Sequence, residues 1–379
     1  MTWSTLSWGL FGFYLILTFG TSCNLKSGPG SQQPQDTPRE TSCETRGTWL
    51  WASSIDSENK RAVVLQKISN ANLNTVFVSI PPINGNHGYG TADAFLEFIK
   101  EAKILELSIH GWMANGRRKG RDVQVEFRDP GEQDAQVQWV NDLLNLYGDY
   151  LDGVHLDYIR YIDGEAVNLD KKMDGVTETV RKIANRLKTN FPGKFLTAAV
   201  FREEPSREEV YRDPPLWVED VPQWFRQWYA ANPGSIYHGS GWVYVPMHMK
   251  YQQNPIGWIK EEIMDAVMPM KYTIHDDEWN QTADYFKSFN AFVGNEPTAT
   301  YMGIGWMPKT SDSSNRGFDP PGVVRKIRYG RSIGMNGFVI FILANHETDD
   351  SALIDALVLD SGVNGNHAPF KEWVPSCLK

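Results

Sequence analysis

The chain has 379 residues, of which 41% are hydrophobic and 12% aromatic, and its formal net charge is −9 at pH 7. This length and hydrophobic content are sufficient for one large domain with a full core. The negative charge argues against nucleic acid or an anionic membrane surface as the main partner, and it favours a neutral or cationic ligand. The 14 Trp and 15 Tyr residues are many for an α/β protein, so some are expected to stack against a ligand while others pack in the core.

The first 23 residues have the features of an export signal. An apolar run, Trp8–Phe19, precedes Gly20-Thr21-Ser22-Cys23, an order typical of a secretory signal with a lipoprotein-type cleavage site. We therefore expect residues 1–23 to be a signal peptide, Cys23 to be lipidated, and the protein to be exported and held at the cell envelope by that lipid. No basic residue precedes the run and Gly20 stands where Leu is usual, so plain secretion and a retained membrane anchor are alternatives. The run is short for a bilayer span.

Residues 24–42 form a segment of different composition. The sequence NLKSGPGSQQPQDTPRETS has no aromatic residue and is rich in Pro, Gly, Ser and Gln. Such a segment buries too little apolar surface to offset the entropy of ordering it. We predict a flexible linker here, followed by one domain over residues 43–379.

From Arg46 onward, short β-rich runs alternate with longer amphipathic segments, the pattern of repeated βα units around a parallel sheet. The expected strands are Gly47–Ser53, Thr75–Ile80, Leu107–Trp112, Gly153–Asp157, Phe195–Phe201, Ala266–Met270, Ala299–Gly305 and Gly337–Leu343. The expected helices are Lys60–Asn70, Ala92–Leu105, Glu132–Tyr147, Gly175–Asn190, Trp279–Phe289, Pro321–Ile333 and Ser351–Leu357. Eight strands alternating with helices predict an α/β protein, a (β/α)8 TIM barrel.

One connection is too long for a single βα unit. The stretch from Glu203 to Ile263 follows the fifth strand and is rich in Trp and Tyr. Because βα loops emerge at the carboxyl ends of the strands, we expect this excursion to lie over the active face.

Three cysteines in an exported chain leave one unpaired, and acylation of Cys23 removes that imbalance. In a closed barrel the first strand starts, and the last helix ends, at the same face. Cys43 and Cys377 are therefore expected to form a disulfide that closes the barrel, with two free thiols as the alternative.

Catalytic groups of this fold lie at the carboxyl ends of strands. In Asp152–Tyr161 (DGVHLDYIRY), strand alternation directs Val154 and Leu156 outward and Gly153, His155 and Asp157 into the lumen. Asp157 then lies at the mouth, and His155 and Arg160 are expected to keep it ionised. The alternative is an Asp–Arg pair that only fixes the loop.

Several motifs accompany this segment: Arg46–Trp49 (RGTW), Ile109–Asn115 (IHGWMAN), Arg128–Gly131 (RDPG), Asp265–Tyr272 (DAVMPMKY), Gly303–Gly305 (GIG) and Gly337–Phe341 (GFVIF). With the fourth-strand string they resemble the glycosyl hydrolase-like 10 family of bacterial exported proteins, from about Arg46 to Leu343. The resemblance implies a (β/α)8 barrel that cleaves a cell-envelope glycan, because a characterised relative acts on peptidoglycan strands stripped of their peptides. It also implies roles in substrate contact for Asp56, Asn115, Arg117, Asp157, Tyr158 and Arg160.

Glycoside hydrolysis ordinarily needs two carboxylates. Relatives tend to have an acidic residue before the Pro and Trp that precede strand six, but this chain has Gln253-Asn254-Pro255-Ile256-Gly257-Trp258. For the second carboxylate we favour Asp276, because its strand lies two strands from that of Asp157. The other candidates are Glu203, Glu204 and Glu347, and each of these acids could instead be a solvated loop residue. A 2-acetamido sugar could also supply its own nucleophile.

Aromatic residues at strand ends are candidate sugar platforms: Trp51, Trp112, Tyr158, Tyr272 and Trp306. Trp112 and Tyr272 are favoured, and His155 is included among the substrate-binding residues, whereas Trp49 is expected in the core.

Other chemistries have weaker support. The first strand ends without the His-X-His of metal-dependent barrels, no nucleotide-binding glycine motif follows a strand, and no Gly-X-Ser-X-Gly elbow is present. We expect no cofactor, no metal and a polysaccharide as the substrate. The rival hypothesis is a non-catalytic glycan-binding protein on the same scaffold, which would lack a second carboxylate within about 5–10 Å of Asp157.

Overall fold

The computed structural model describes residues 43–116, 124–161, 169–202, 216–217, 227, 238–239, 242–243, 247–293, 300–306, 318–335, 337–360 and 368–378. The expected signal peptide, the lipidation site at Cys23 and the linker lie outside these ranges. Within them, no helix has both the length and the apolar character needed to cross a membrane.

Eight parallel strands close into a barrel with the order β1-β11-β10-β9-β5-β4-β3-β2. Their bounds are β1 (Thr45–Leu50), β2 (Thr75–Ser79), β3 (Ser108–Ala114), β4 (Gly153–Asp157), β5 (Phe195–Val200), β9 (Ala266–Lys271), β10 (Met302–Gly305) and β11 (Gly337–Phe341). Each corresponds to one of the eight predicted strands, and the predicted (β/α)8 barrel is confirmed.

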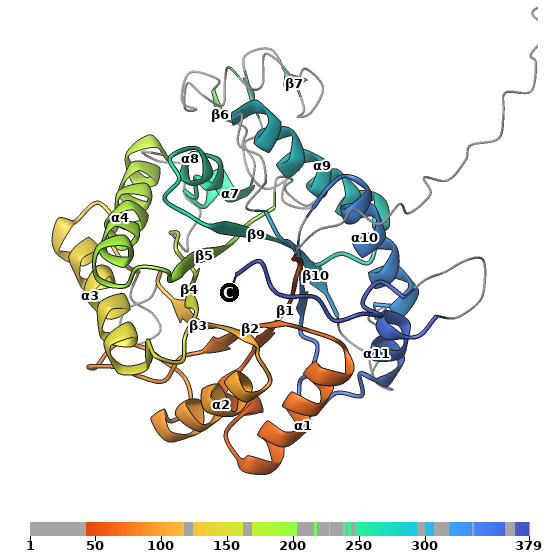
Figure 1. Cartoon of the computed structure of the whole chain (residues 1–379). Coiled ribbons are helices and arrows are strands. Elements are labelled where there is room, and N and C mark those ends of the chain that lie inside the picture. Colours follow the sequence, from red (N-terminus) through yellow and green to blue (C-terminus); the bar gives the residue numbers. More distant parts are fainter. Residues whose placement is uncertain are drawn as a thin grey trace, which may run out of the picture. The chain divides into compact units, whose positions relative to one another are not determined.

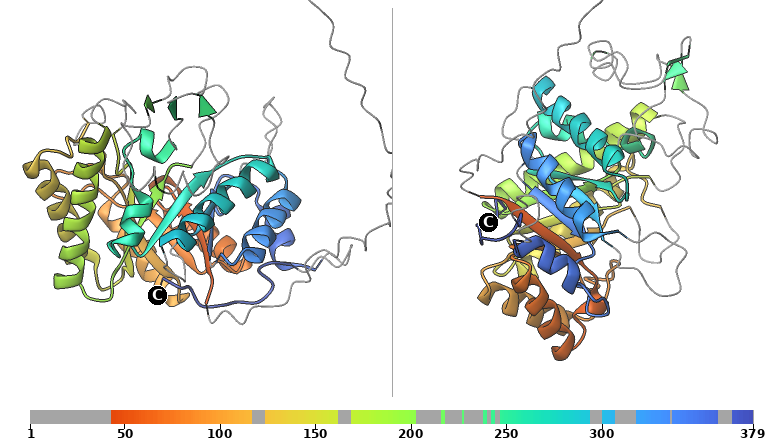
Figure 2. Two further views of the ribbon diagram at one scale, coloured as in Figure 1. Left: turned by 90° about the horizontal axis from the view of Figure 1, so that it is seen from above. Right: turned by 90° about the vertical axis from the view of Figure 1, so that its right-hand side faces the viewer.

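Helices surround the strands on the outside, as Figures 1 and 2 show. They are α1 (Glu58–Asn70), α2 (Ala92–Ile104), α3 (Pro130–Tyr147), α4 (Leu169–Asn190), α7 (Met247–Lys250), α8 (Pro255–Lys260), α9 (Asp276–Val293), α10 (Pro320–Ser332) and α11 (Ser351–Val358). Five of them, α1, α3, α4, α9 and α10, begin earlier than predicted, and the difference is largest for α4 and α9. Helix α4 starts at Leu169 rather than Gly175, and α9 starts at Asp276 rather than Trp279. Three acids in the first turn of α9 suit the positive end of its dipole.

Alternation along the strands separates an outer core from the lumen. Val154 and Leu156 belong to the cluster that packs under the helices, while Trp49 and Trp112 belong to a second cluster in the lumen. This is the arrangement predicted from the strand-four segment. Gly153 is required there, because a Cβ atom would lie 2.4 Å from the carbonyl oxygen of Phe195 and 2.5 Å from Nδ1 of His110.

Most of the excursion between Glu203 and Ile263 lies outside the described residues. Its described parts are a three-stranded antiparallel sheet with the order β6-β8-β7, made of β6 (Leu216–Trp217), β7 (His238–Gly239) and β8 (Trp242–Val243), and the helices α7 and α8. Its position over the active face stays a prediction.

The amino-terminal end of the barrel is closed by residues 368–378, here called the C-terminal segment (Figure 1). Leu378 is 1% exposed within the lumen cluster, and its carbonyl oxygen accepts a hydrogen bond from the Ser108 hydroxyl. Cys43 and Cys377 form the expected disulfide, with their Cα atoms 5.1 Å apart. The two ends of the domain therefore meet at this face.

Candidate active site

Asp157 is the last residue of β4 and lies beside Ala114 of β3 at the carboxyl end of the barrel. Oδ2 of Asp157 accepts a hydrogen bond from Nε1 of Trp112 at 3.1 Å, and Oδ1 accepts one from the backbone N–H of Tyr158 at 2.7 Å. The residue is only 6% exposed. Two N–H donors from neighbouring segments thus fix the orientation of a buried carboxyl group.

Burial raises the pKa of Asp157 above the ordinary value of an aspartate. The charge of Arg160 and the hydrogen bonds from Tyr158 and Trp112 act in the opposite direction and do not overcome burial. Nη1 of Arg160 is 3.8 Å from Oδ1 of Asp157, which is too long for a hydrogen bond. The expected net effect of Arg160 and His155, a lowered pKa, is therefore not found: burial outweighs the charge of Arg160, and the pKa of Asp157 lies above its ordinary value.

His155 lies one alternation step below Asp157 in the lumen and is fully buried. Its Nε2 accepts a hydrogen bond from Nε1 of Trp49 at 3.0 Å, so its Nδ1, 2.9 Å from the Thr197 hydroxyl, carries the proton of the neutral ring. Burial, with a smaller effect from His110, holds the pKa of His155 well below its usual range. The predicted role of His155 in substrate binding does not fit this environment, because the side chain is fully buried and both ring nitrogens are engaged, by Trp49 and Thr197.

The turn after β4 has a fixed geometry. Tyr158 has a φ of +52°, which is uncommon for a residue other than glycine, and the carbonyl of Asp157 accepts the N–H of Asn115 at 2.7 Å. The guanidinium of Arg160 lies between two rings, 4.4 Å from the centroid of Tyr158 and 4.3 Å from that of Phe201. Tyr158 and Arg160, two of the residues for which the resemblance implies substrate contact, therefore do meet at the Asp157 site.

Tyr272 follows β9 and faces the same site. Burial and the negative charge of Asp157 raise the pKa of its hydroxyl well above the usual value. Its ring stacks on Phe341 with centroids 4.9 Å apart and an interplanar angle of 12°. The residue as a whole is 36% exposed. Of the two favoured platforms, Tyr272 has the accessible surface.

Trp112 differs from the predicted platform, because it is only 7% exposed. Its ring packs against Trp51, with centroids 4.6 Å apart, and its indole N–H is used by Asp157. It holds the acid in place rather than offering an open face.

Asp276, the favoured second carboxylate, lies in the first turn of α9. Its Oδ2 accepts from Nε of Arg325 at 2.5 Å and its Oδ1 from Nζ of Lys326 at 2.8 Å. Burial opposes its ionisation, but these two cations together hold the pKa of Asp276 below its usual value. Both oxygens are thus engaged by α10, and the group is an ionised anchor between two helices.

Gln253 lies ahead of β9, in the segment where the resemblance implies an acidic residue. It is fully buried; its Oε1 accepts the backbone N–H of Phe201 at 2.8 Å, and its Nε2 donates to the carbonyl of Ala199 at 3.2 Å. The end of β5 presents one backbone N–H and one carbonyl oxygen, and the amide of Gln253 pairs with both. A carboxylate could accept from the N–H but has no proton to donate to the carbonyl oxygen.

Of the remaining predicted residues, only Asn115 is described next to Asp157. Asn115 is fully buried and donates to Gln136 at 3.0 Å, and Asp56 forms an exposed ion pair with Lys60 at 2.9 Å. The side chain of Glu347 is 74% exposed. Arg117, Glu203 and Glu204 lie outside the described residues.

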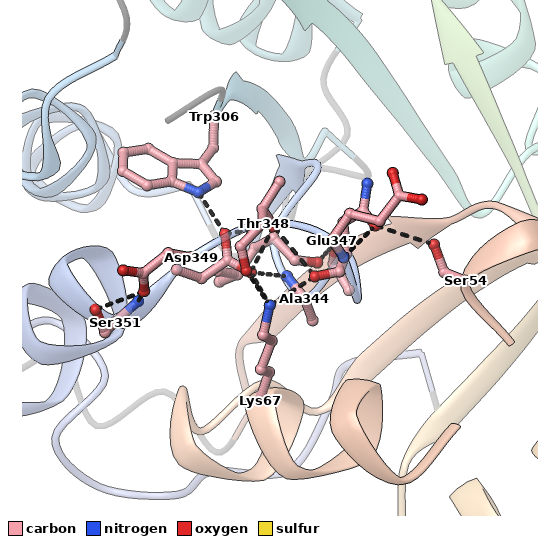
Figure 3. Close-up of polar contacts among 12 residues, drawn as sticks. Ser54, Lys67, Trp306, Ala344, Glu347, Thr348, Asp349 and Ser351 are labelled. Atoms are coloured by element: carbon pink, nitrogen blue, oxygen red, sulfur yellow. Dashed lines mark hydrogen bonds and ion pairs between the residues drawn. The ribbon is translucent and has the colours of Figure 1, made fainter. Parts of the chain in front are cut away.

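Trp306 is a core residue rather than a sugar platform. It is 4% exposed, and its Nε1 donates to Oδ1 of Asp350 at 2.8 Å. The side chain of Asp350 is fully buried, and its Oδ2 accepts from Nζ of Lys67 at 3.1 Å and from the N–H of Ala344 at 3.1 Å (Figure 3). This cluster joins α1 to the loop after β11, and the sequence prediction missed it because its members are far apart in the chain.

The barrel is similar to several solved structures. A chitinase from Chromobacterium violaceum ATCC 12472 gives a TM-score of 0.52 at 13% identity, over 82% of this chain and 97% of that one. The glycoside hydrolase domain of PgaB (BpsB) from Bordetella bronchiseptica gives 0.51 at 10%, over 84% and 100%. A hyperthermostable endo-1,4-β-D-mannanase from Thermotoga petrophila RKU-1 gives 0.53 at 10%, over 79% and 88%.

At such low identities these similarities show the fold, a (β/α)8 barrel. No model of a protein family matches the sequence, and no curated protein matches it.

Proposed function

We propose that the chain is a glycoside hydrolase that cleaves an amino-sugar glycan of the cell envelope, with Asp157 as the proton donor. The observation that carries this proposal is the environment of Asp157: a carboxyl group at the carboxyl end of a barrel strand, 6% exposed, with a pKa raised by burial. A general acid for glycosidic cleavage must hold its proton near neutral pH, and burial is the usual means.

The second catalytic role falls to the substrate in this proposal. Both oxygens of Asp276 are engaged by Arg325 and Lys326, so Asp276 is poorly placed to attack a sugar. In a 2-acetamido sugar, the acetamido carbonyl oxygen can attack the anomeric carbon. Asp157 would give its proton to the departing glycosidic oxygen, and would then accept a proton from the water that opens the cyclic intermediate. The Tyr272 hydroxyl, kept protonated by its raised pKa, would donate a hydrogen bond to the sugar.

Three further points support a glycan as the substrate. The motifs of the fourth strand resemble those of the glycosyl hydrolase-like 10 family. The solved barrels of similar fold include a chitinase and the PgaB glycoside hydrolase domain, both named for glycan chemistry. The signal-like residues 1–23 and the linker would bring the barrel to the cell envelope as a lipoprotein, or release it as a secreted protein.

The test is release of reducing ends from peptide-free peptidoglycan strands and partly deacetylated amino-sugar polymers, by the wild-type chain and by Asp157→Asn. We expect release by the wild type and a loss of at least about a hundredfold in the variant. Circular dichroism should show that the variant is folded. If neither protein releases ends and both bind the glycans equally well, the protein is a glycan-binding module and the proposal is wrong.

A further inference from the structure

Aromatic side chains form a continuous row that leads away from Asp157 toward the loop between β2 and α2. Trp112 donates to Asp157, and Trp51 packs against Trp112 with centroids 4.6 Å apart. Tyr89 of the β2–α2 loop meets Trp51 edge-on, at 6.1 Å and an interplanar angle of 79°. Trp112 is nearly buried, whereas Trp51 and Tyr89 are both partly exposed. The accessible part of the row therefore lies one ring beyond the acid.

The β2–α2 loop is built to hold Tyr89 in this position. The backbone N–H of Tyr89 donates to the carbonyl of Ile80 at 2.8 Å. A Cβ atom on Gly88 would lie 2.2 Å from the backbone of Pro81, and Gly90 has a φ of +74° with its Cβ position 2.8 Å from Cβ of Ala52. Glycines on both sides thus let the loop press against the ends of the first two strands, and the Tyr89 ring is ordered before any ligand arrives.

The chemistry of this surface suits a sugar. Its exposed members are uncharged rings, and the imidazole of His87 meets Tyr89 edge-on at 4.7 Å. A pyranose ring has an apolar face of C–H groups and a rim of hydroxyls, so it matches a flat aromatic face bordered by polar groups. An ordered aromatic surface also binds with little loss of side-chain entropy.

We propose that Trp51 and Tyr89 form a subsite for a second sugar ring, next to the sugar that contacts Asp157 in the glycan chain. The inference rests on the proposed function, because the Asp157 site defines the first sugar. It adds that affinity should rise with chain length, and that the rise should depend on Tyr89.

The experiment measures dissociation constants for β-1,4-linked N-acetylglucosamine oligomers, from the disaccharide to the hexasaccharide, in the Asp157→Asn protein so that no cleavage occurs. We expect Tyr89→Ala in this background to weaken hexasaccharide binding by about tenfold, or about 1.4 kcal/mol, and to abolish the gain from longer chains. Tyr89→Phe keeps the ring and should keep most of the gain. Trp373→Ala, which removes a 48% exposed aromatic from the C-terminal segment, is the matched control and should bind as its parent does.

Two results would overturn the subsite. In one, Tyr89→Ala is folded and gains affinity with chain length as its parent does; in the other, the parent binds none of the oligomers. Reducing-end release by the wild-type chain is measured separately and decides the proposed function. If binding rises with chain length through Tyr89 but the wild type releases no reducing ends, the subsite is supported and the hydrolase proposal is wrong. If the wild type releases reducing ends and the Tyr89 variant releases them equally well, the hydrolase proposal is supported and the subsite is wrong.

Discussion

The indole nitrogen of Trp112 lies 3.1 Å from Oδ2 of Asp157 and joins the carboxyl ends of β3 and β4 through a single hydrogen bond. This bond favours the ionised form of Asp157 and so lowers a pKa that burial raises. Its removal should therefore be visible in the pH dependence of the proposed reaction.

Trp112→Phe should move the alkaline limb of the pH–activity profile to higher pH. A proton donor is active below its pKa and loses activity as pH rises through it. Burial has already raised the pKa of Asp157, and loss of the Trp112 donor raises it further. The measurement is kcat/KM for glycan cleavage as a function of pH. Trp139→Phe is the matched control, since Trp139 is 2% exposed and its Nε1 has no hydrogen-bond partner among the described residues. An unmoved alkaline limb in Trp112→Phe would show that Asp157 does not set it.

Asp276→Asn should lower stability while retaining most of the glycan release. The variant leaves the side chain of Lys326, which is 2% exposed, without its carboxylate, at a cost of about 2 kcal/mol. Because the pKa of Asp276 is depressed in the folded protein, its contribution is present above the unfolded pKa and is lost as pH falls through the folded one. Denaturant unfolding at neutral and acidic pH should show the difference shrink in acid. Asp277→Asn, at an exposed neighbouring position, is the control. A hundredfold loss of activity in Asp276→Asn would instead identify it as the second carboxylate.

Lys67→Met should destabilise the fold by about 3 kcal/mol, because it leaves the fully buried carboxylate of Asp350 without its cation. The variant also removes the donor to the carbonyl oxygens of Asn345 and Thr348, so the loop after β11 should exchange its amide hydrogens faster. Thermal unfolding and hydrogen exchange would measure both effects. Lys60→Met removes an exposed ion pair and should cost less than about 0.5 kcal/mol. Equal costs for the two variants would contradict the role given to the buried cluster.

Replacing both Cys43 and Cys377 by Ser should lower the free energy of unfolding by about 2–4 kcal/mol, as expected when a cross-link between distant residues is lost. Differential scanning calorimetry should give the same lower Tm for the variant and for reduced wild type. A wild type whose Tm does not respond to a reductant, under conditions in which thiol titration finds both cysteines reduced, would contradict this prediction.

The sequence was sufficient to predict the barrel, because its eight strands are apolar runs whose period and spacing are local properties. The same alternation placed Asp157 at a strand end and His155 in the lumen. It could not predict how deeply these two side chains are buried, because burial depends on neighbours from other strands. Trp112 donates a hydrogen bond to Asp157, and Trp49 donates one to His155. Sequence position therefore located the acid but gave the wrong direction for its pKa.

Two aromatic residues illustrate the same limit. Trp306 directly follows β10 and is therefore predicted to be a platform, but its indole N–H donates to Asp350, which lies 44 residues further along the chain. Tyr89 was not singled out, because a βα loop has no periodicity to read. The one local signal was an aromatic residue between Gly88 and Gly90, and its meaning depends on the close approach of both glycines to Pro81 and Ala52.

The disulfide between Cys43 and Cys377 makes the 334-residue span between them a covalent ring. A protease that cuts one loop within this span opens the ring without dividing the protein, and the two pieces of the barrel stay joined through the sulfur atoms. A nicked molecule would remain a single species on a non-reducing gel and would separate into two bands only after reduction. Exposed loops around the mouth can therefore be cut once, in an oxidising environment, without any part of the barrel diffusing away.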